Sequence, residues 1–160
     1  KNLSQITDIN TGTLKTIRRL SMQISARNQI SGTVELIEHG KINAEIFIKL
    51  KSGYTLVSVI TNTAANNLNL EIGDEVVAIF KSSTVLITTD ITLNISARNK
   101  FQGTVDSINQ DEINTELVID IGNNDKIASV ITSSSFERLK IEKGTQVSAI
   151  IKASDVIIGK

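Results

Sequence analysis

The sequence has no cysteine, no proline and no tryptophan, and it has a single histidine. Without cysteine it can form no disulfide, no cysteine-ligated zinc cluster and no thiol nucleophile, which fits a reducing compartment and predicts a cytoplasmic protein. No apolar run approaches the roughly 18 residues that a membrane-spanning helix needs. The first residues, KNLSQITDINTG, also lack the apolar stretch of a secretory signal. We therefore expect no membrane association.

The charge balance excludes a second class of partner. Seventeen Lys and Arg residues are matched by 17 Asp and Glu residues, so no overall field draws the chain to nucleic acid. Aromatic side chains, on which single-stranded bases would stack, are limited to four phenylalanines and one tyrosine. We expect no nucleic-acid binding through these residues, and any anion site must be local.

An internal repeat organises the chain. A shift of about 71 residues superposes 24–89 on 95–160 without a gap, with about 27 identities. The segments that recur include ISARN, GTV and SVIT, and each copy ends in Lys-x-Ser followed by Val-x-Ile. A gapless match of this extent indicates tandem duplication, with a first domain at 24–89, a second at 95–160 and a connection too short to be a flexible linker.

Each copy reads as five short strands with a helical turn after the third. In the first copy we expect strands at 33–37, 42–50, 56–60, 75–80 and 85–87, and a helix within 61–70. This order predicts an all-β fold of two tandem OB-like five-stranded barrels, each with a short helix. Residues 1–23 lie outside the repeat, and Leu14, Ile17 and Leu20 fall at helical spacing, which predicts a partly helical linker segment.

Catalytic residues are scarce. The only histidine, His39, lies in a predicted turn, and Gln110 stands at its place in the second copy, so no duplicated triad is available. The acids that recur are Glu45 with Glu116 and Glu71 with Glu142, at positions that look solvent-facing. No glycine-rich phosphate loop is present. We predict that the chain is not an enzyme and offers no direct metal ligand; a hydrolase of small esters or phosphates is the alternative to test.

The other recurring polar side chains are hydrogen-bond donors or cations, and none is an acid. A tetrahedral dianion needs positive charge and converging donors, which arginine, lysine and hydroxyl groups supply. Each residue alone also has an ordinary structural reading: an ion pair for Arg27, a helix cap for Thr61, an edge-strand charge for Lys81. The recurring set is Ser25, Arg27, Asn28, Thr61, Lys81 and Ser83, with Ser96, Arg98, Asn99, Thr132, Lys152 and Ser154 in the second copy.

The strings SARNQISGTV, INAEI, SVIT, L-x-L-x-x-GDEV and K-x-S-x-V-x-I resemble the Mop or TOBE-type molybdate-binding domains over nearly all of 21–160. The resemblance implies OB-like barrels that bind molybdate or tungstate, as ligand and not as cofactor, between subunits. In that arrangement the SARN and Lys-x-Ser segments of one copy face the threonine-led helix turn of another. The oxyanion-binding positions it implies are Ser25, Arg27, Thr61, Lys81, Ser82 and Ser83, and Ser96, Arg98, Thr132, Ser135, Lys152, Ala153 through its backbone N–H, and Ser154.

Two kinds of protein share this tandem arrangement: the sensor half of molybdate-responsive transcription regulators, and free-standing molybdate-storage proteins called molbindins. The stretch Leu14 to Gln23 resembles the linker that joins the sensor to a DNA-binding half, so we expect a dimeric sensor whose contact with DNA is made by a domain preceding Lys1. A storage protein, as a trimer or hexamer, is the alternative. The copies are also unequal, because Ala64 stands where the second copy has Ser135.

Overall fold

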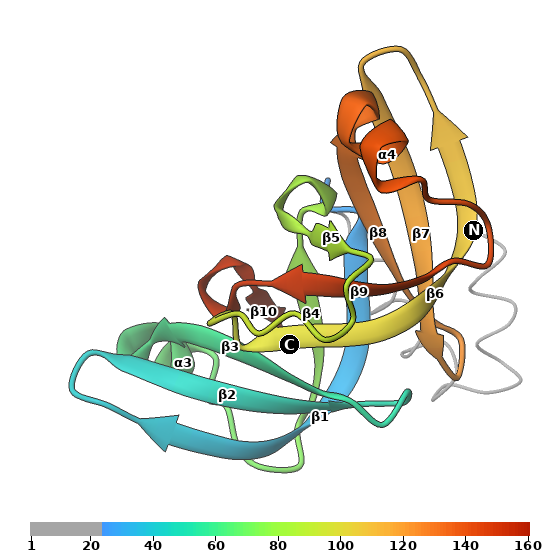
Figure 1. The fold of residues 1–160 in the computed structure, drawn as a ribbon. Coiled ribbons are helices and arrows are strands. Elements are labelled where there is room, and N and C mark those ends of the chain that lie inside the picture. The colour runs from blue at the N-terminus through green and yellow to red at the C-terminus, as the bar shows by residue number, and fades with distance from the viewer. Residues whose placement is uncertain (1–23) are drawn as a thin grey trace, which may run out of the picture.

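The computed structural model describes residues 24–160 as an all-β fold of two five-stranded sheets, each curled into an OB-like barrel that carries one short helix (Figure 1). The predicted fold class is confirmed, whereas the predicted helical linker lies outside the described residues. The first repeat contributes β1 (Asn28–His39), β2 (Asn43–Leu50), β3 (Thr55–Thr61), α3 (Asn62–Asn67), β4 (Glu75–Phe80), the 3-10 turn η1 (Ser82–Thr84) and β5 (Leu86–Thr88). The second contributes β6 (Asn99–Gln110), β7 (Asn114–Gly122), β8 (Asp125–Thr132), α4 (Ser133–Leu139), β9 (Gln146–Ile151), η2 (Ala153–Asp155) and β10 (Ile157–Gly159).

The last strand of each repeat belongs to the other repeat's sheet. The strand orders are β10-β4-β1-β2-β3 and β5-β9-β6-β7-β8, and all of these neighbours are antiparallel. Ile158 of β10 therefore pairs with Ala78 of β4, and Ile87 of β5 pairs with Ala149 of β9. In Figure 1 the segments that lead into the exchanged strands, from β4 to β5 and from β9 to β10, cross at the centre of the molecule. Each barrel thus takes four strands from one repeat and one from the other.

The first strand of each repeat is longer than its polar N-terminal half predicts. β1 begins at Asn28, pairs with β4 through residue 33 and then with β2 from Gly32 onward, with a bulge between Val34 and Leu36. One bent strand can therefore serve two partners. At the bend a Cβ on Gly32 would lie 2.5 Å from Ile48 Cγ2 and 2.7 Å from the Lys49 carbonyl oxygen, so glycine is required by close approach of β2.

Replacing the equivalent Gly103 with alanine is expected to lower the free energy of unfolding by about 1–3 kcal/mol. Its Cβ would lie 2.5 Å from the Asp120 carbonyl oxygen and 2.9 Å from Ile119 Cγ2, so the backbone of β7 must move. Urea denaturation measures the change, with exposed Gln102→Ala in the same strand as the control. Equal stabilities for the two variants would mean that the bend is relaxed at no cost.

The barrel interiors are filled by aliphatic side chains at alternate strand positions. In β2, Ala44, Ile46, Ile48 and Leu50 are buried, as the alternation predicts, whereas Ile42, expected on the same face, precedes the strand and is 73% exposed. Leu117, Ile119 and Ile121 repeat the buried pattern in β7. Phe80 and Phe101 are the largest fully buried side chains. The buried residues of both repeats form one hydrophobic cluster, so the two barrels share a core.

Two buried asparagines join the repeats. The amide of Asn28, at the end of the SARN motif, donates to the Ala128 carbonyl oxygen at 2.9 Å and accepts from the Ala128 N–H at 2.7 Å. Asn99 makes the same pair of bonds with Val57, both at 2.8 Å. Each amide therefore satisfies the backbone of the edge strand, β8 or β3, of the opposite repeat. These asparagines belong to the framework and are not free donors.

The SVIT motif also spans the repeats. Ser58 donates through Oγ to the Val156 carbonyl oxygen at 2.7 Å, and Ser129 donates to that of Val85 at 2.8 Å. Both serines are fully buried. Val85 and Val156 lead into the exchanged strands, so the serines fix the crossing segments and with them the turns η1 and η2.

The connection between the repeats is an ordered turn. Asp90 accepts hydrogen bonds from the hydroxyl and the backbone N–H of Thr92, at 2.7 and 3.1 Å, and the hydroxyl bond is the main reason that the pKa of Asp90 is lowered. The Thr88 hydroxyl in turn accepts from the Asp90 N–H. This turn carries the chain from β5 in one sheet to the second SARN motif.

Candidate functional site

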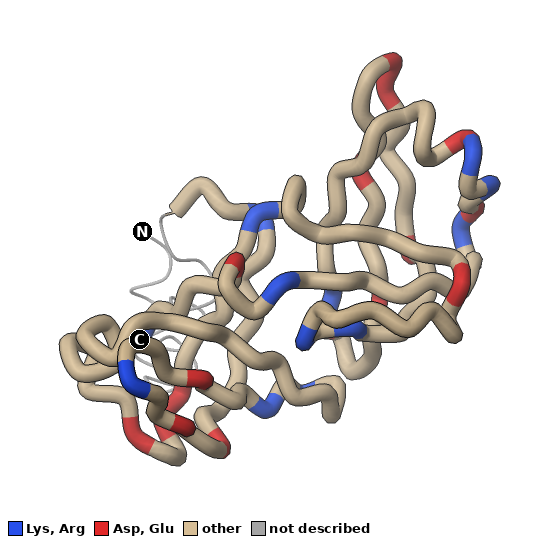
Figure 2. The backbone as a smooth tube through the Cα atoms, turned by 60° about the vertical axis from the view of Figure 1, so that its left-hand side comes forward, with Lys and Arg blue, Asp and Glu red and all other residues tan. Residues whose placement is uncertain are grey.

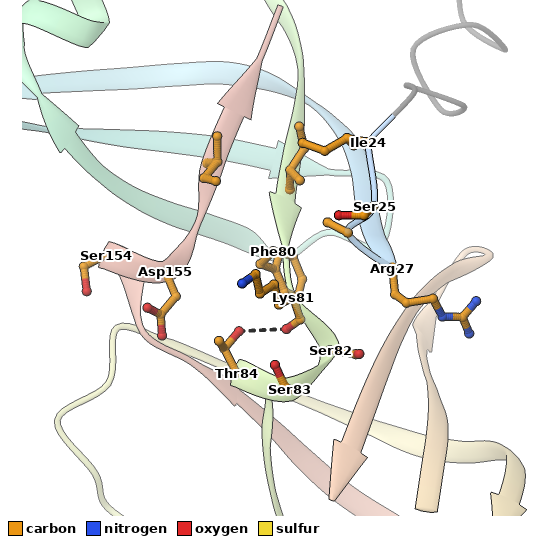
Figure 3. Close-up of a pocket in the computed structure, with 13 residues that line it drawn as sticks. Ile24, Ser25, Arg27, Phe80, Lys81, Ser82, Ser83, Thr84, Ser154 and Asp155 are labelled. Atoms are coloured by element: carbon orange, nitrogen blue, oxygen red, sulfur yellow. Dashed lines mark hydrogen bonds between the residues drawn. The ribbon is translucent and has the colours of Figure 1, made fainter.

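A pocket of about 580 Å³ lies where the first SARN segment meets η1 (Figure 3). β4 places Lys81 at its end, η1 presents Ser82 and Ser83, and the residues before β1 supply Ser25 and Arg27. η2 and β10 of the other repeat close the pocket with Ser154, Asp155 and Ile157. The structure therefore brings the SARN and Lys-x-Ser segments of the first repeat together, because Asn28 of β1 pairs with Phe80 of β4, and the exchange of the last strands adds the wall from the other repeat.

The second repeat forms a matching pocket. It is lined by Ser96, Arg98, Lys152, Ala153 and Ser154, with Ser83 and Thr84 of η1 on its other side. Ala153, which is buried, has only a methyl side chain and offers this pocket no hydroxyl, unlike Ser82 in the first. The two pockets share Ser83, Thr84, Ser154 and Asp155 and are therefore adjacent.

The lysines and the arginines of these pockets differ in their partners. Within residues 24–160 the amino groups of Lys81 and Lys152 have no hydrogen-bond or ion-pair partner, so their charges are available. Arg27 instead pairs with Glu116 at 2.6 Å, and Arg98 pairs with Glu45 at 2.7 Å. Both glutamates are partly exposed on their strands, and each also meets an arginine of the other repeat.

The threonine-led turns lie away from both pockets. Thr61 caps α3 by accepting from the Ala64 N–H at 3.0 Å, and Thr132 caps α4 by accepting from the Ser135 N–H at 3.1 Å. Thr132 also donates to Ser135 Oγ at 2.9 Å. Thr61, Thr132 and Ser135 line neither pocket within the chain. Both threonines are exposed, which leaves these turns open to contact from outside.

One pocket residue was missed from the sequence. Asp155 lines both pockets, and Thr84 stands at its place in the first repeat. Because the search for site residues followed what recurs, an acid present in one copy gave no signal. Its carboxylate offsets part of the positive charge of the two lysines.

The described part of the chain offers little to support catalysis by histidine or the binding of a metal ion. His39 ends β1 in an exposed position, with Nδ1 2.9 Å from Asn62 Oδ1, far from the pocket residues in the fold. Residues 24–160 hold no group of three or more histidine, aspartate or glutamate residues that could bind a metal ion. No helix in this range has the length and hydropathy to cross a membrane. Figure 2 shows basic and acidic residues mixed on both barrels.

Comparison with known proteins gives the same repeat. The model of the TOBE domain matches residues 24–87 and again 95–158. The molybdenum transport protein ModE of Azotobacter vinelandii is 34% identical over 158 residues, which cover 96% of this chain and 58% of that protein. The molybdenum-pterin-binding protein MopA of Rhodobacter capsulatus is 36% identical over 146 residues, 91% of this chain and 55% of that protein. The chain thus spans little more than half the length of these relatives.

A solved structure is covered over a larger share of its own length than these relatives are. The cytoplasmic molybdate-binding protein ModG, with molybdate bound, superposes with a TM-score of 0.83 at 40% identity, covering 86% of this chain and 99% of ModG. The agreement therefore extends over the whole of the ModG chain and both of the barrels described above. The chain belongs to the TOBE domain family, with two copies of the domain in tandem.

Proposed function

We propose that the chain binds molybdate or tungstate in its two pockets and does no chemistry on the anion. The observation that carries the proposal is the convergence of an unpaired lysine with serine hydroxyls, Lys81 with Ser82, Ser83 and Ser25, in a pocket built from both repeats. Lysine supplies charge, and hydroxyl groups rotate to donate to the oxygens of a tetrahedral anion. The relatives named for molybdenum and molybdate support this choice of anion.

The finer proposal is a ligand-sensing domain of a molybdate-dependent transcriptional regulator in the cytoplasm. It is supported by the match to ModE over 96% of this chain. In this role anion binding stabilises one arrangement of subunits over another, and DNA is contacted only by a domain outside these residues. The second candidate, a molybdate-storage protein, is favoured by the complete coverage of ModG, which needs no further domain.

A second copy of the chain would complete each pocket. The pocket rims carry exposed aliphatic residues at matched positions: Ile157, 59% exposed, in the first pocket and Leu86, 56% exposed, in the second. Ile24 and Ile95 repeat the pattern. Apolar groups beside a polar pocket favour burial against a partner. The exposed turn of Thr132 and Ser135 has the donors to reach an anion from the other side.

The test is calorimetric titration with molybdate, tungstate and sulfate, together with mass measurement in solution. Micromolar binding of molybdate or tungstate is expected, and the sulfate titration measures how far the pockets discriminate between tetrahedral dianions. A dimer supports the sensor, and a trimer or hexamer supports the store. If none of the three anions binds at micromolar concentration, the proposal fails.

Lys81→Ala is expected to weaken molybdate binding by about 1.5–3 kcal/mol, the contribution of one charged hydrogen bond. Lys152→Ala tests the second pocket in the same way. Lys41→Ala, an exposed lysine in the β1–β2 turn, removes the same charge away from both pockets and serves as the control. Unchanged affinity in the Lys81 variant would make this residue an ordinary surface charge.

A further inference from the structure

Two ion pairs at matched positions join the repeats beside the pockets. Arg27, just before β1, donates through Nε to Glu116 Oε2 at 2.9 Å, and its Nη2 lies 2.6 Å from the same oxygen. Arg98, just before β6, donates through Nη1 to Glu45 Oε2 at 2.7 Å. Each glutamate lies in the second strand of the opposite repeat, β7 or β2. Surface pairs stabilise proteins little, so stability alone does not explain why both copies have one.

Each ion pair engages an arginine that lines its pocket. Figure 3 shows the Arg27 side chain extending from the pocket rim in the direction opposite to Lys81. Two of its three guanidinium nitrogens face the Glu116 carboxylate. Arg98 is held further by Phe47, with its Cζ 5.9 Å from the ring centroid. Lys81 has no such partner within residues 24–160. Before an anion binds, the arginines are therefore paired with carboxylates, whereas the lysines are not.

A carboxylate and a tetrahedral oxyanion compete for the same donors, because both are acceptors without protons to give. Even where the arginine reaches both at once, the glutamate cancels part of the charge that attracts the anion. The arginine side chains are about half exposed, 56% and 45%, so an anion can reach them while they are paired with the glutamates.

We propose that Glu116 and Glu45 are counter-charges that lower the oxyanion affinity of the two pockets, acting through Arg27 and Arg98. The inference rests on the proposed function of the pockets. The oxyanion affinity of each pocket then depends on both repeats. One repeat supplies the arginine, and the glutamate of the other repeat neutralises part of its charge. Binding at one pocket also loosens a link between the two barrels.

The test compares molybdate affinities of the 160-residue chain and its Glu116→Gln variant by calorimetry. Glutamine keeps the size of the side chain and an oxygen for Arg27 to bond, so the fold is retained while the charge is removed. The affinity is expected to rise by about 3- to 20-fold in buffer of moderate salt. Glu112→Gln, an exposed acid in the same repeat with the same charge change, is the control and should leave the affinity near that of the parent.

The gain must depend on the arginine. In an Arg27→Ala background, Glu116→Gln is expected to add nothing, which a purely structural role of Glu116 would not predict. An affinity that is unchanged or lower in Glu116→Gln, a gain that persists without Arg27, or an equal gain in Glu112→Gln would overturn the inference while the proposed function stands. Absence of molybdate binding by the parent chain would instead overturn the proposed function, and this inference with it.

Discussion

Asn28→Ala is expected to lower the free energy of unfolding by about 2–5 kcal/mol, since it leaves two buried backbone groups of Ala128 without partners. Asn28 is only 2% exposed, so water cannot replace the lost amide without opening the contact between β1 and β8. Urea denaturation followed by circular dichroism measures the change. The control is Asn109→Ala, at an exposed position in another strand.

The same experiment on the second repeat should give a comparable loss, because Asn99 makes the equivalent two bonds with Val57. Asn28→Asp is expected to be no better than alanine, since a carboxylate cannot donate to the Ala128 carbonyl oxygen and is costly to bury. A loss no greater than that of Asn109→Ala would show that the amide bridge contributes nothing to holding the repeats together.

Deleting residues 157–160 is expected to destabilise the first barrel, although the deletion lies in the second repeat. It removes Ile158, 6% exposed in the core, and the pairing of β10 with β4. It also removes the Lys160 amino group, which lies 3.0 Å from Asp74 Oδ2. Loss of the buried isoleucine alone costs about 2–5 kcal/mol, so the whole deletion should cost more.

Hydrogen exchange locates the effect of the deletion. The amides of β4 should lose protection before those of β9, while removal of Lys160 alone should change little in either strand. If the deleted chain does not fold, Ile158→Ala gives the same comparison with a milder change. Loss of protection in β9 with β4 unaffected would contradict the exchange of strands.

Much of the architecture could be predicted because it depends on local pattern. Alternation of buried residues located β2 and β7, and threonine before a polar stretch marked the caps of α3 and α4. The recurrence of Ser25, Lys81 and Ser83 with their counterparts indicated a set of donors, and the resemblance to the Mop or TOBE-type domains implied that the SARN and Lys-x-Ser segments would meet. The pockets bring these segments together.

The exchange of strands could not be predicted, and duplication is the reason. Leu86–Thr88 and Ile157–Gly159 are nearly alike in hydrophobicity, so either fits the edge of either sheet. Which pairing occurs depends on how the connections cross, a property of the whole chain. The partners of Arg27 and Asn28 depend on how the two repeats pack together. The sequence pattern therefore did not indicate that Arg27 would pair with Glu116 or that Asn28 would bond to Ala128.

The exchanged strands also constrain how the protein is made. During synthesis the N-terminal repeat emerges first, yet β4 has no neighbour on one side until Ile157–Gly159 leaves the ribosome. An unpaired strand edge is a template for pairing with other chains. β5 likewise has no partner strand until β9 has emerged. Nascent chains on one messenger RNA therefore pass through a period in which neighbours could exchange strands, and the two barrels are completed together, once β9 and β10 have both emerged.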